Sequence, residues 1–407
     1  MRRASAPLAL LAVLGPGLLA GLSDDDPAGV TTYSILGADY GYRLLWVLLL
    51  STVALILFHE LGARMGIVTG QGLAGLIRQR YGVRTAAGGL LALVMANVGT
   101  MCAELAGVAA ALELAGVTRY LSVPLAALGV SLLVLRGSFK RVEHVLLALS
   151  AVFVAYIVSG LLAHPDWGAA AHGLFVPSLP GSREALLAAT ATVGTTLAPW
   201  GLAFIQSYAI DKRLTPADLR LERVDVAVGA VLTGVIGLFI IVACAETLHA
   251  EGRSIDDARD AATALAPLAG SLASTLFGAG LLGAALLAAA VLPLSTAYSV
   301  SEAFGYEAGL DDSFAQARIF YLTFVAVVVV AVAVVLVPGA PLIPILFLSQ
   351  ALNAILLLPL LVLSYGIATD RVLMGDHALS GPGRVATLAV IALVAVCLAA
   401  LAALSIA

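Results

Sequence analysis

Residues 23–29 read Ser-Asp-Asp-Asp-Pro-Ala-Gly (SDDDPAG) and interrupt the first long apolar segment of the chain, which covers about residues 7–40. Proline removes a backbone donor and glycine weakens a helix, so this stretch predicts a break in the first helix. One charged side chain at the centre of a membrane helix costs about 2.5–3.5 kcal/mol on insertion scales. Three successive carboxylates therefore indicate a functional feature and not a lipid-facing surface.

The composition predicts an all-α integral membrane protein. Of the 407 residues, 61% are hydrophobic and 11% are charged, whereas soluble domains carry about 25% charged residues. The apolar runs reach the length of roughly 20 residues that a helix needs to cross a lipid bilayer, and barrel strands would be about half as long. No basic block suggests a nucleic-acid partner, and the three cysteines stand singly in apolar runs, so we expect neither a disulfide nor a zinc site.

Hydropathy and punctuation predict eleven membrane spans. They lie near residues 7–40, 43–66, 84–114, 120–136, 141–163, 184–210, 224–249, 270–304, 315–337, 342–368 and 384–406. With a cytoplasmic amino terminus, only five of the 21 Lys and Arg residues fall in outer loops, namely Arg43, Arg119, Arg183, Arg253 and Arg259. The positive-inside rule therefore predicts a multi-pass cell-membrane protein with this orientation.

A second interruption lies in the sixth span, where residues 195–201 read TTLAPWG. The two breaks are five helices apart, as in two five-helix units of inverted topology whose broken first helices face each other at the bilayer midplane. Unwound backbone persists at membrane depth only inside protein or beside a wet cavity, because its polar groups must be satisfied. The paired breaks therefore predict a substrate site.

The residue types at the breaks favour a cation. Asp26 directly precedes Pro27, and half-helix carboxyl ends add partial negative charge to its carboxylate. Asp24 and Asp25 have two interpretations: they lie nearer the water and cap the second half-helix, or they face the ion. Around Thr195 and Ala198 the chain offers carbonyls and hydroxyls but no thioether or imidazole, and hard oxygen ligands with room for water suit Mg²⁺.

Several motifs together resemble the Nramp family of divalent metal transporters. They are GPG at 15–17, DPAG at 26–29, LGARMGIVTGQGL at 61–73, CAELAGVAAAL at 102–112, SQALNAILLLP at 349–359 and LMGDH at 373–377. The resemblance implies a LeuT-type fold of two inverted five-helix repeats plus an eleventh transmembrane helix. It implies one transporter domain, residues 1–407, with repeat one at about 7–163, repeat two at about 184–368 and the extra helix at about 384–406. It implies no enzymatic activity and no cofactor.

The same resemblance implies a central metal site that the chain opens and closes by alternating access. Its expected members are Asp25, Asp26, Gly29, Thr195 through its carbonyl, Ala198 and, by position, Gln350. Gln350 also has a simpler interpretation, because polar side chains inside membranes often only bridge helices.

The departures from the family pattern concern metal and proton chemistry. The family's D-P-G-N reads Asp26-Pro27-Ala28-Gly29, so Gly29 replaces an asparagine ligand, and M-P-H reads Ala198-Pro199-Trp200. Glu104 is kept, whereas Met101 stands where the proton-accepting aspartate is expected. This pattern is similar to the Nramp-related magnesium transporters, which implies transport of largely hydrated Mg²⁺, and also Mn²⁺, without obligatory proton coupling. The alternatives are a proton-coupled Mn²⁺/Fe²⁺ transporter and a cation-coupled amino-acid transporter of the same fold.

Three other residues have open interpretations. His59-Glu60 begins like the zinc motif H-E-x-x-H, but position 63 is alanine, so we expect a polar packing or gating role for His59. Glu104 is either a relay carboxylate or a protonated group packed against a neighbour. Trp200 either covers the cavity or fills the space of the missing histidine, and its indole cannot coordinate a metal.

Overall fold

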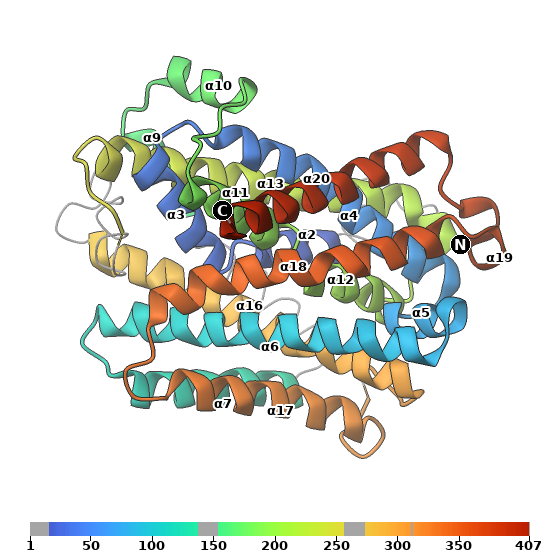
Figure 1. The fold of residues 1–407 in the computed structure, drawn as a ribbon. Coiled ribbons are helices and arrows are strands. Elements are labelled where there is room, and N and C mark those ends of the chain that lie inside the picture. The colour runs from blue at the N-terminus through green and yellow to red at the C-terminus, as the bar shows by residue number, and fades with distance from the viewer. Residues whose placement is uncertain (1–15, 137–153, 256–272, 311, 407) are drawn as a thin grey trace, which may run out of the picture.

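The computed structural model describes residues 16–136, 154–255, 273–310 and 312–406, and the regular structure of these residues is helical (Figure 1). Nine helical segments of this part are long and apolar enough to cross a membrane. They are α4 (Leu45–Thr69), α6 (Val83–Glu113), α7 (Arg119–Arg136), the pair α11 (Arg183–Thr196) and α12 (Pro199–Asp211), α13 (Leu219–Cys244) with its flanking turns, α16 (Ala273–Phe304), α17 (Arg318–Val335), α18 (Leu342–Ala368) and α20 (Gly381–Ile406). The predicted all-α membrane protein is confirmed.

The two remaining predicted spans lie partly outside the described residues. Of the first span, the described part forms α2 (Pro16–Ser23) and α3 (Pro27–Tyr40), and of the fifth it forms α9 (Val154–Leu162). The sequence interpretation missed several short helices in the connections. These are α5 (Leu73–Tyr81), η2 (Pro216–Asp218), α10 (Trp167–Phe175), the π-helical turn η3 (Ala245–His249), α19 (Arg371–Met374) and η5 (Gly375–His377).

Both helix breaks have the same backbone cause. Pro27 begins α3 and Pro199 begins α12, and each proline lacks the N–H that the carbonyl four residues earlier would accept in a continuous helix. Those carbonyls belong to Ser23 and Thr195, the last or next-to-last residues of α2 and α11. The break predicted across residues 195–201 is confined to Leu197 and Ala198.

The broken helices pack in a reciprocal way through small residues. The α2 helix lies on α13, where a Cβ at Gly21 would come 2.6 Å from the carbonyl carbon of Gly229. The α12 helix lies on α4, where a Cβ at Gly62 would come 2.8 Å from the carbonyl oxygen of Leu202. Small residues allow such close backbone approach between membrane helices. The first broken span thus packs on the seventh and the sixth packs on the second, as inverted repeats require.

Long helices enclose the breaks on one side. In Figure 1, α6 runs the length of the molecule with α7 and α17 side by side along its outer edge. The opposite face of α6 packs against α16 and α18. This arrangement carries Glu104 of α6 and Gln350 of α18, both fully buried, towards the interior where the breaks lie.

Side-chain contacts tie both ends of the bundle. At the end that holds α10, Tyr42 donates a hydrogen bond to Glu246, and burial together with this carboxylate raises the pKa of Tyr42 above its ordinary value. At the opposite end, Glu60 pairs with Arg64 and with Arg223, the latter at 2.9 Å. The polar residues of the breaks, among them Asp24, Asp25, Asp26 and Thr195, are buried between these contacts.

Candidate metal centre

The two breaks lie against each other. A Cβ on Gly29, in the first turn of α3, would be 3.3 Å from Oγ1 of Thr195 at the end of α11. One turn further along α3, the Tyr33 hydroxyl lies 3.1 Å from Oγ1 of Thr196. The structure thus brings Asp26, Gly29 and Thr195 together, as the five-helix offset predicts.

Asp26 is the N-cap of α3. Its backbone is extended (φ −68°, ψ 171°), and its Oδ1 accepts a hydrogen bond from the amide of Gly29 at 2.5 Å. Pro27 occupies the first helical position, where its fixed φ is pre-organised, so the residue before it becomes the cap. The interpretation that Asp24 and Asp25 lie near water and cap this helix is therefore wrong. Both are buried, and Asp26 is the cap.

Asp24 and Asp25 supply buried oxygens that lack donors. Among the described residues, none of their four carboxylate oxygens has a hydrogen-bond partner. Asp24 comes nearest to one, with its Oδ2 at 3.9 Å from Nε2 of His59. A buried carboxylate without a partner is costly, and a cation would offset that cost.

The second break contributes neutral oxygen. Oγ1 of Thr195 is buried without a hydrogen-bond partner in the described part of the chain. The Thr195 carbonyl lacks its usual helical donor, because the residue four positions later is Pro199, which has no N–H. Ala198 is the N-cap of α12, with no side-chain cap, and its carbonyl accepts the amide of Gly201 at 3.0 Å. Thr195 therefore offers the freer oxygens of the two.

Gln350 lies beside the second break but its amide is used elsewhere. A Cβ on Gly194 would overlap the carbonyl oxygen of Gln350, which places this residue of α18 directly against α11. Its Oε1 accepts a hydrogen bond from Asn353 at 3.0 Å, and Asn353 also donates to Thr100 of α6 at 3.0 Å. In this conformation Gln350 belongs to a network that bridges α18 and α6.

Helix α6 brings a further carboxyl group to the first break. A Cβ on Gly107 would overlap the ring of Pro27, so α6 touches the first turn of α3 at this point. One turn earlier on the same helix, Glu104 is fully buried, and neither of its carboxylate oxygens has a hydrogen-bond partner within the described residues. Met101 is buried on the same helix and supplies no titratable group.

His59 lies at the breaks, and the sequence analysis did not predict this position. Its ring is fully buried, and a Cβ on Gly201 of α12 would come 2.8 Å from its Nε2. The available signal was a histidine in the middle of an apolar span, but its direction depends on how α4 packs against α12. The residues of the second break themselves supply no imidazole, as the sequence shows, and His59 reaches this break from α4.

Trp200 fills space beside the second break. Its side chain is buried, and its ring lies 6.3 Å from that of Phe204, centroid to centroid. Its indole N–H has no acceptor among the residues that the structure describes.

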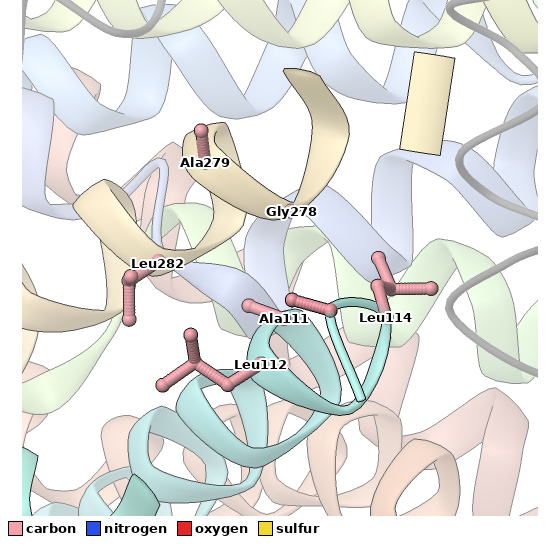
Figure 2. Close-up of a pocket in the computed structure, with 7 residues that line it drawn as sticks. Ala111, Leu112, Leu114, Gly278, Ala279 and Leu282 are labelled. Atoms are coloured by element: carbon pink, nitrogen blue, oxygen red, sulfur yellow. The ribbon is translucent and has the colours of Figure 1, made fainter. Parts of the chain in front are cut away.

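The metal centre does not coincide with the pocket of Figure 2. That pocket of about 230 Å³ lies between the end of α6 and the start of α16, lined by Ala111, Leu112, Leu114, Ala115, Gly278, Ala279 and Leu282. These side chains are apolar and offer no ligand. Within the described ranges, no three His, Cys, Asp or Glu side chains converge closely enough to hold an ion. A metal centre at the breaks must therefore also use backbone carbonyls, hydroxyls or water.

Comparison with known proteins decides the family. The family described as "Natural resistance-associated macrophage protein-like" (Nramp) matches residues 17–404. The chain belongs to the Nramp family. The matched residues include both breaks and every predicted site residue.

Two curated relatives carry the name divalent metal cation transporter MntH. The protein of Burkholderia ambifaria is 34% identical over 289 residues, which cover 67% of this chain and 64% of the relative. The protein of Aeromonas hydrophila is 30% identical over 382 residues, covering 90% and 89%. The chain thus spans slightly less than two thirds of the first relative and most of the second.

Solved structures confirm the fold of this Nramp chain. The manganese transporter of Eremococcus coleocola superimposes with a TM-score of 0.79 at 21% identity, covering 98% of this chain and 87% of that protein. MhsT in complex with L-phenylalanine gives a TM-score of 0.67 at 16% identity, with 98% of each chain covered. The LeuT-type fold implied by the Nramp resemblance is therefore confirmed.

Proposed function

We propose that this chain transports divalent metal cations across the cell membrane by alternating access, with Mg²⁺ as the main substrate and Mn²⁺ as a second. One observation carries the proposal. The carboxylates of Asp24 and Asp25 are buried without hydrogen-bond donors among the described residues, and they stand next to Asp26 at a break that faces the neutral oxygens of Thr195. The names of the two MntH relatives support the same substrate class.

The preference for Mg²⁺ rests on what surrounds Asp26. Ala198 supplies no thioether where one would favour transition metals, and Gly29 supplies no side-chain ligand. Few direct ligands and small side chains leave space for water, which suits an ion that dehydrates reluctantly. Asp25, Asp26, the Thr195 and Ala198 carbonyls and, after rearrangement, Gln350 are the proposed ligands, with Gly29 leaving a ligand position to water.

We infer transport without obligatory proton coupling from two side chains that cannot take up or release a proton at physiological pH. Met101 and Trp200 stand where the Nramp pattern has its proton-linked aspartate and histidine. We further infer that the amino terminus is cytoplasmic and that residues 1–407 form one domain, with repeats at about 7–163 and 184–368 and an extra helix at 384–406. The reciprocal packing of α2 on α13 and of α12 on α4 supports this division.

The direct test is uptake into proteoliposomes with a Mg²⁺-sensitive dye inside. Wild-type protein should admit Mg²⁺ without an inward proton gradient. Asp26→Asn keeps an N-cap acceptor but removes the charge, and it should reduce uptake at least about a hundredfold, since a lost charged ligand of about 3 kcal/mol corresponds to two powers of ten. Asp376→Asn, an exposed carboxylate in η5, is the matched control and should leave uptake unchanged.

One observation favours the proton-coupled Mn²⁺/Fe²⁺ alternative, namely the buried, unpartnered carboxyl of Glu104 on α6, the helix that touches Pro27 at the first break. Entry of Mn²⁺ or Fe²⁺ with acidification of the lumen, and no entry of Mg²⁺, would establish that alternative. The amino-acid transporter alternative is disfavoured, since a substrate carboxylate would meet three acidic side chains at the first break.

A further inference from the structure

We propose that His59 and Asp24 form a second cation subsite, in which a divalent ion leaving Asp26 gains a nitrogen donor. This inference rests on the proposed transport function and names a step within it. The subsite is not part of the ligand set inferred from the sequence, because its imidazole comes from α4 and not from either broken helix.

Both side chains are buried and lack partners. His59 is 0% exposed and Asp24 is 1% exposed. Neither ring nitrogen of His59 has a hydrogen bond within the described residues, and neither carboxylate oxygen of Asp24 has one. Buried polar groups are normally hydrogen-bonded, so these four unpaired atoms require a ligand or water to satisfy them.

The distance between the two groups suits a bridging ion. Nε2 of His59 and Oδ2 of Asp24 are 3.9 Å apart, which is too long for a hydrogen bond. Two ligands that each bind one ion at about 2.0–2.1 Å are separated by at most about 4.2 Å. An ion therefore fits between these atoms with little movement of either side chain.

The neighbouring glycine keeps this place open. A Cβ on Gly201 would come 2.8 Å from Nε2 of His59, so any larger residue at the start of α12 would press on the coordinating atom. Along α4, the chain runs from His59 at the breaks towards the end of the bundle that holds Arg64. With the proposed orientation this is the cytoplasmic direction, so the subsite lies on the inward side of Asp26.

The chemistry of the subsite bears on substrate range. Imidazole nitrogen binds Mn²⁺ and later transition metals more readily than it binds Mg²⁺. His59 therefore supplies, from another helix, a nitrogen donor beside the second break, where the indole of Trp200 offers none. We infer that His59 is the reason why Mn²⁺ is accepted beside Mg²⁺.

Pulsed electron paramagnetic resonance of bound Mn²⁺ tests this assignment, because ¹⁴N of a coordinated imidazole modulates the signal. The full-length protein, with any affinity tag removed, should show this modulation, and His59→Gln should abolish it. Mn²⁺ affinity of His59→Gln should fall about tenfold, equivalent to about 1.4 kcal/mol, while Mg²⁺ affinity changes much less. His172→Gln, an exposed histidine of α10, is the matched control and should retain the modulation.

Two further variants keep the test decisive if His59→Gln is unstable. Asp24→Asn and Gly201→Ala leave the histidine in place but remove its partner or displace its ring, and both should weaken the nitrogen modulation. Modulation that persists in His59→Gln, or is absent from wild type, would overturn the subsite. Mg²⁺ uptake without nitrogen modulation would leave the proposed function intact, and nitrogen modulation without Mg²⁺ uptake would leave the subsite intact.

Discussion

The two helix breaks have the same backbone design and opposite electrostatics. Pro27 and Pro199 each begin a second half-helix and free the carbonyl four residues earlier. The first break adds three buried carboxylates, whereas the second adds only hydroxyls and a small alanine. The comparison teaches that unwinding comes from the proline, while the charge that attracts a cation is concentrated on one of the two breaks.

The caps show the same asymmetry. Asp26 satisfies an orphan amide of α3 with its side chain, whereas Ala198 gives α12 no side-chain cap. The amino end of a helix carries partial positive charge, which Asp26 offsets at α3 and which remains at α12. At the proposed site, a cation would therefore be held mainly from the side of the first break, with the Thr195 oxygens as its neutral partners.

After Asp26→Asn, the largest effect at the two breaks should come from Gly29→Asn, which restores the asparagine of the family pattern. A Cβ there would lie 2.7 Å from the Asp24 carbonyl oxygen, so the first break itself would have to shift, and 3.3 Å from Oγ1 of Thr195, so the contact with the second break would tighten. We expect Mg²⁺ uptake to fall about tenfold or more, a barrier of about 1.4 kcal/mol. Gly29→Ala should show most of this loss, because the Cβ alone makes the contact.

If Gly29→Asn instead raised Mn²⁺ uptake at an unchanged Mg²⁺ rate, the close contact between the breaks would be absent from the transporting conformation. Uptake of both ions by the same proteoliposome preparation measures this directly.

A smaller effect should come from Ala198→Met, which adds the thioether that the second break lacks. Sulfur favours transition metals over Mg²⁺, so the ratio of Mn²⁺ to Mg²⁺ uptake should rise about threefold to tenfold. Ala198→Leu is the matched control, because leucine has similar bulk without sulfur. Equal ratios of Mn²⁺ to Mg²⁺ uptake in the two variants would show that the volume of the side chain at position 198, and not its sulfur, determines the preference between the ions.

The sequence predicts what depends on local chemistry. The apolar lengths predict the helices within a few residues, and the prolines predict both breaks. The role of Asp24 was predicted less well, because its burial depends on how the first break packs against His59 of α4, which local chemistry does not reveal. His59 could not be placed at all, since its direction depends on the contact of α4 with Gly201, which is 142 positions away in the chain.

The smallest of these effects should come from Asn353→Ala, which tests whether the second break depends on α18. Asn353 holds Oε1 of Gln350 and links it to Thr100, so its loss leaves buried groups unsatisfied at about 1–3 kcal/mol. We expect a lower melting temperature and a KM for Mg²⁺ raised about threefold, since Gln350 would lose its orientation. Thr100→Val should lower the melting temperature alone, because Asn353 still holds Gln350. A KM unchanged in Asn353→Ala would mean that Gln350 only bridges helices, and that the two breaks hold the ion without α18.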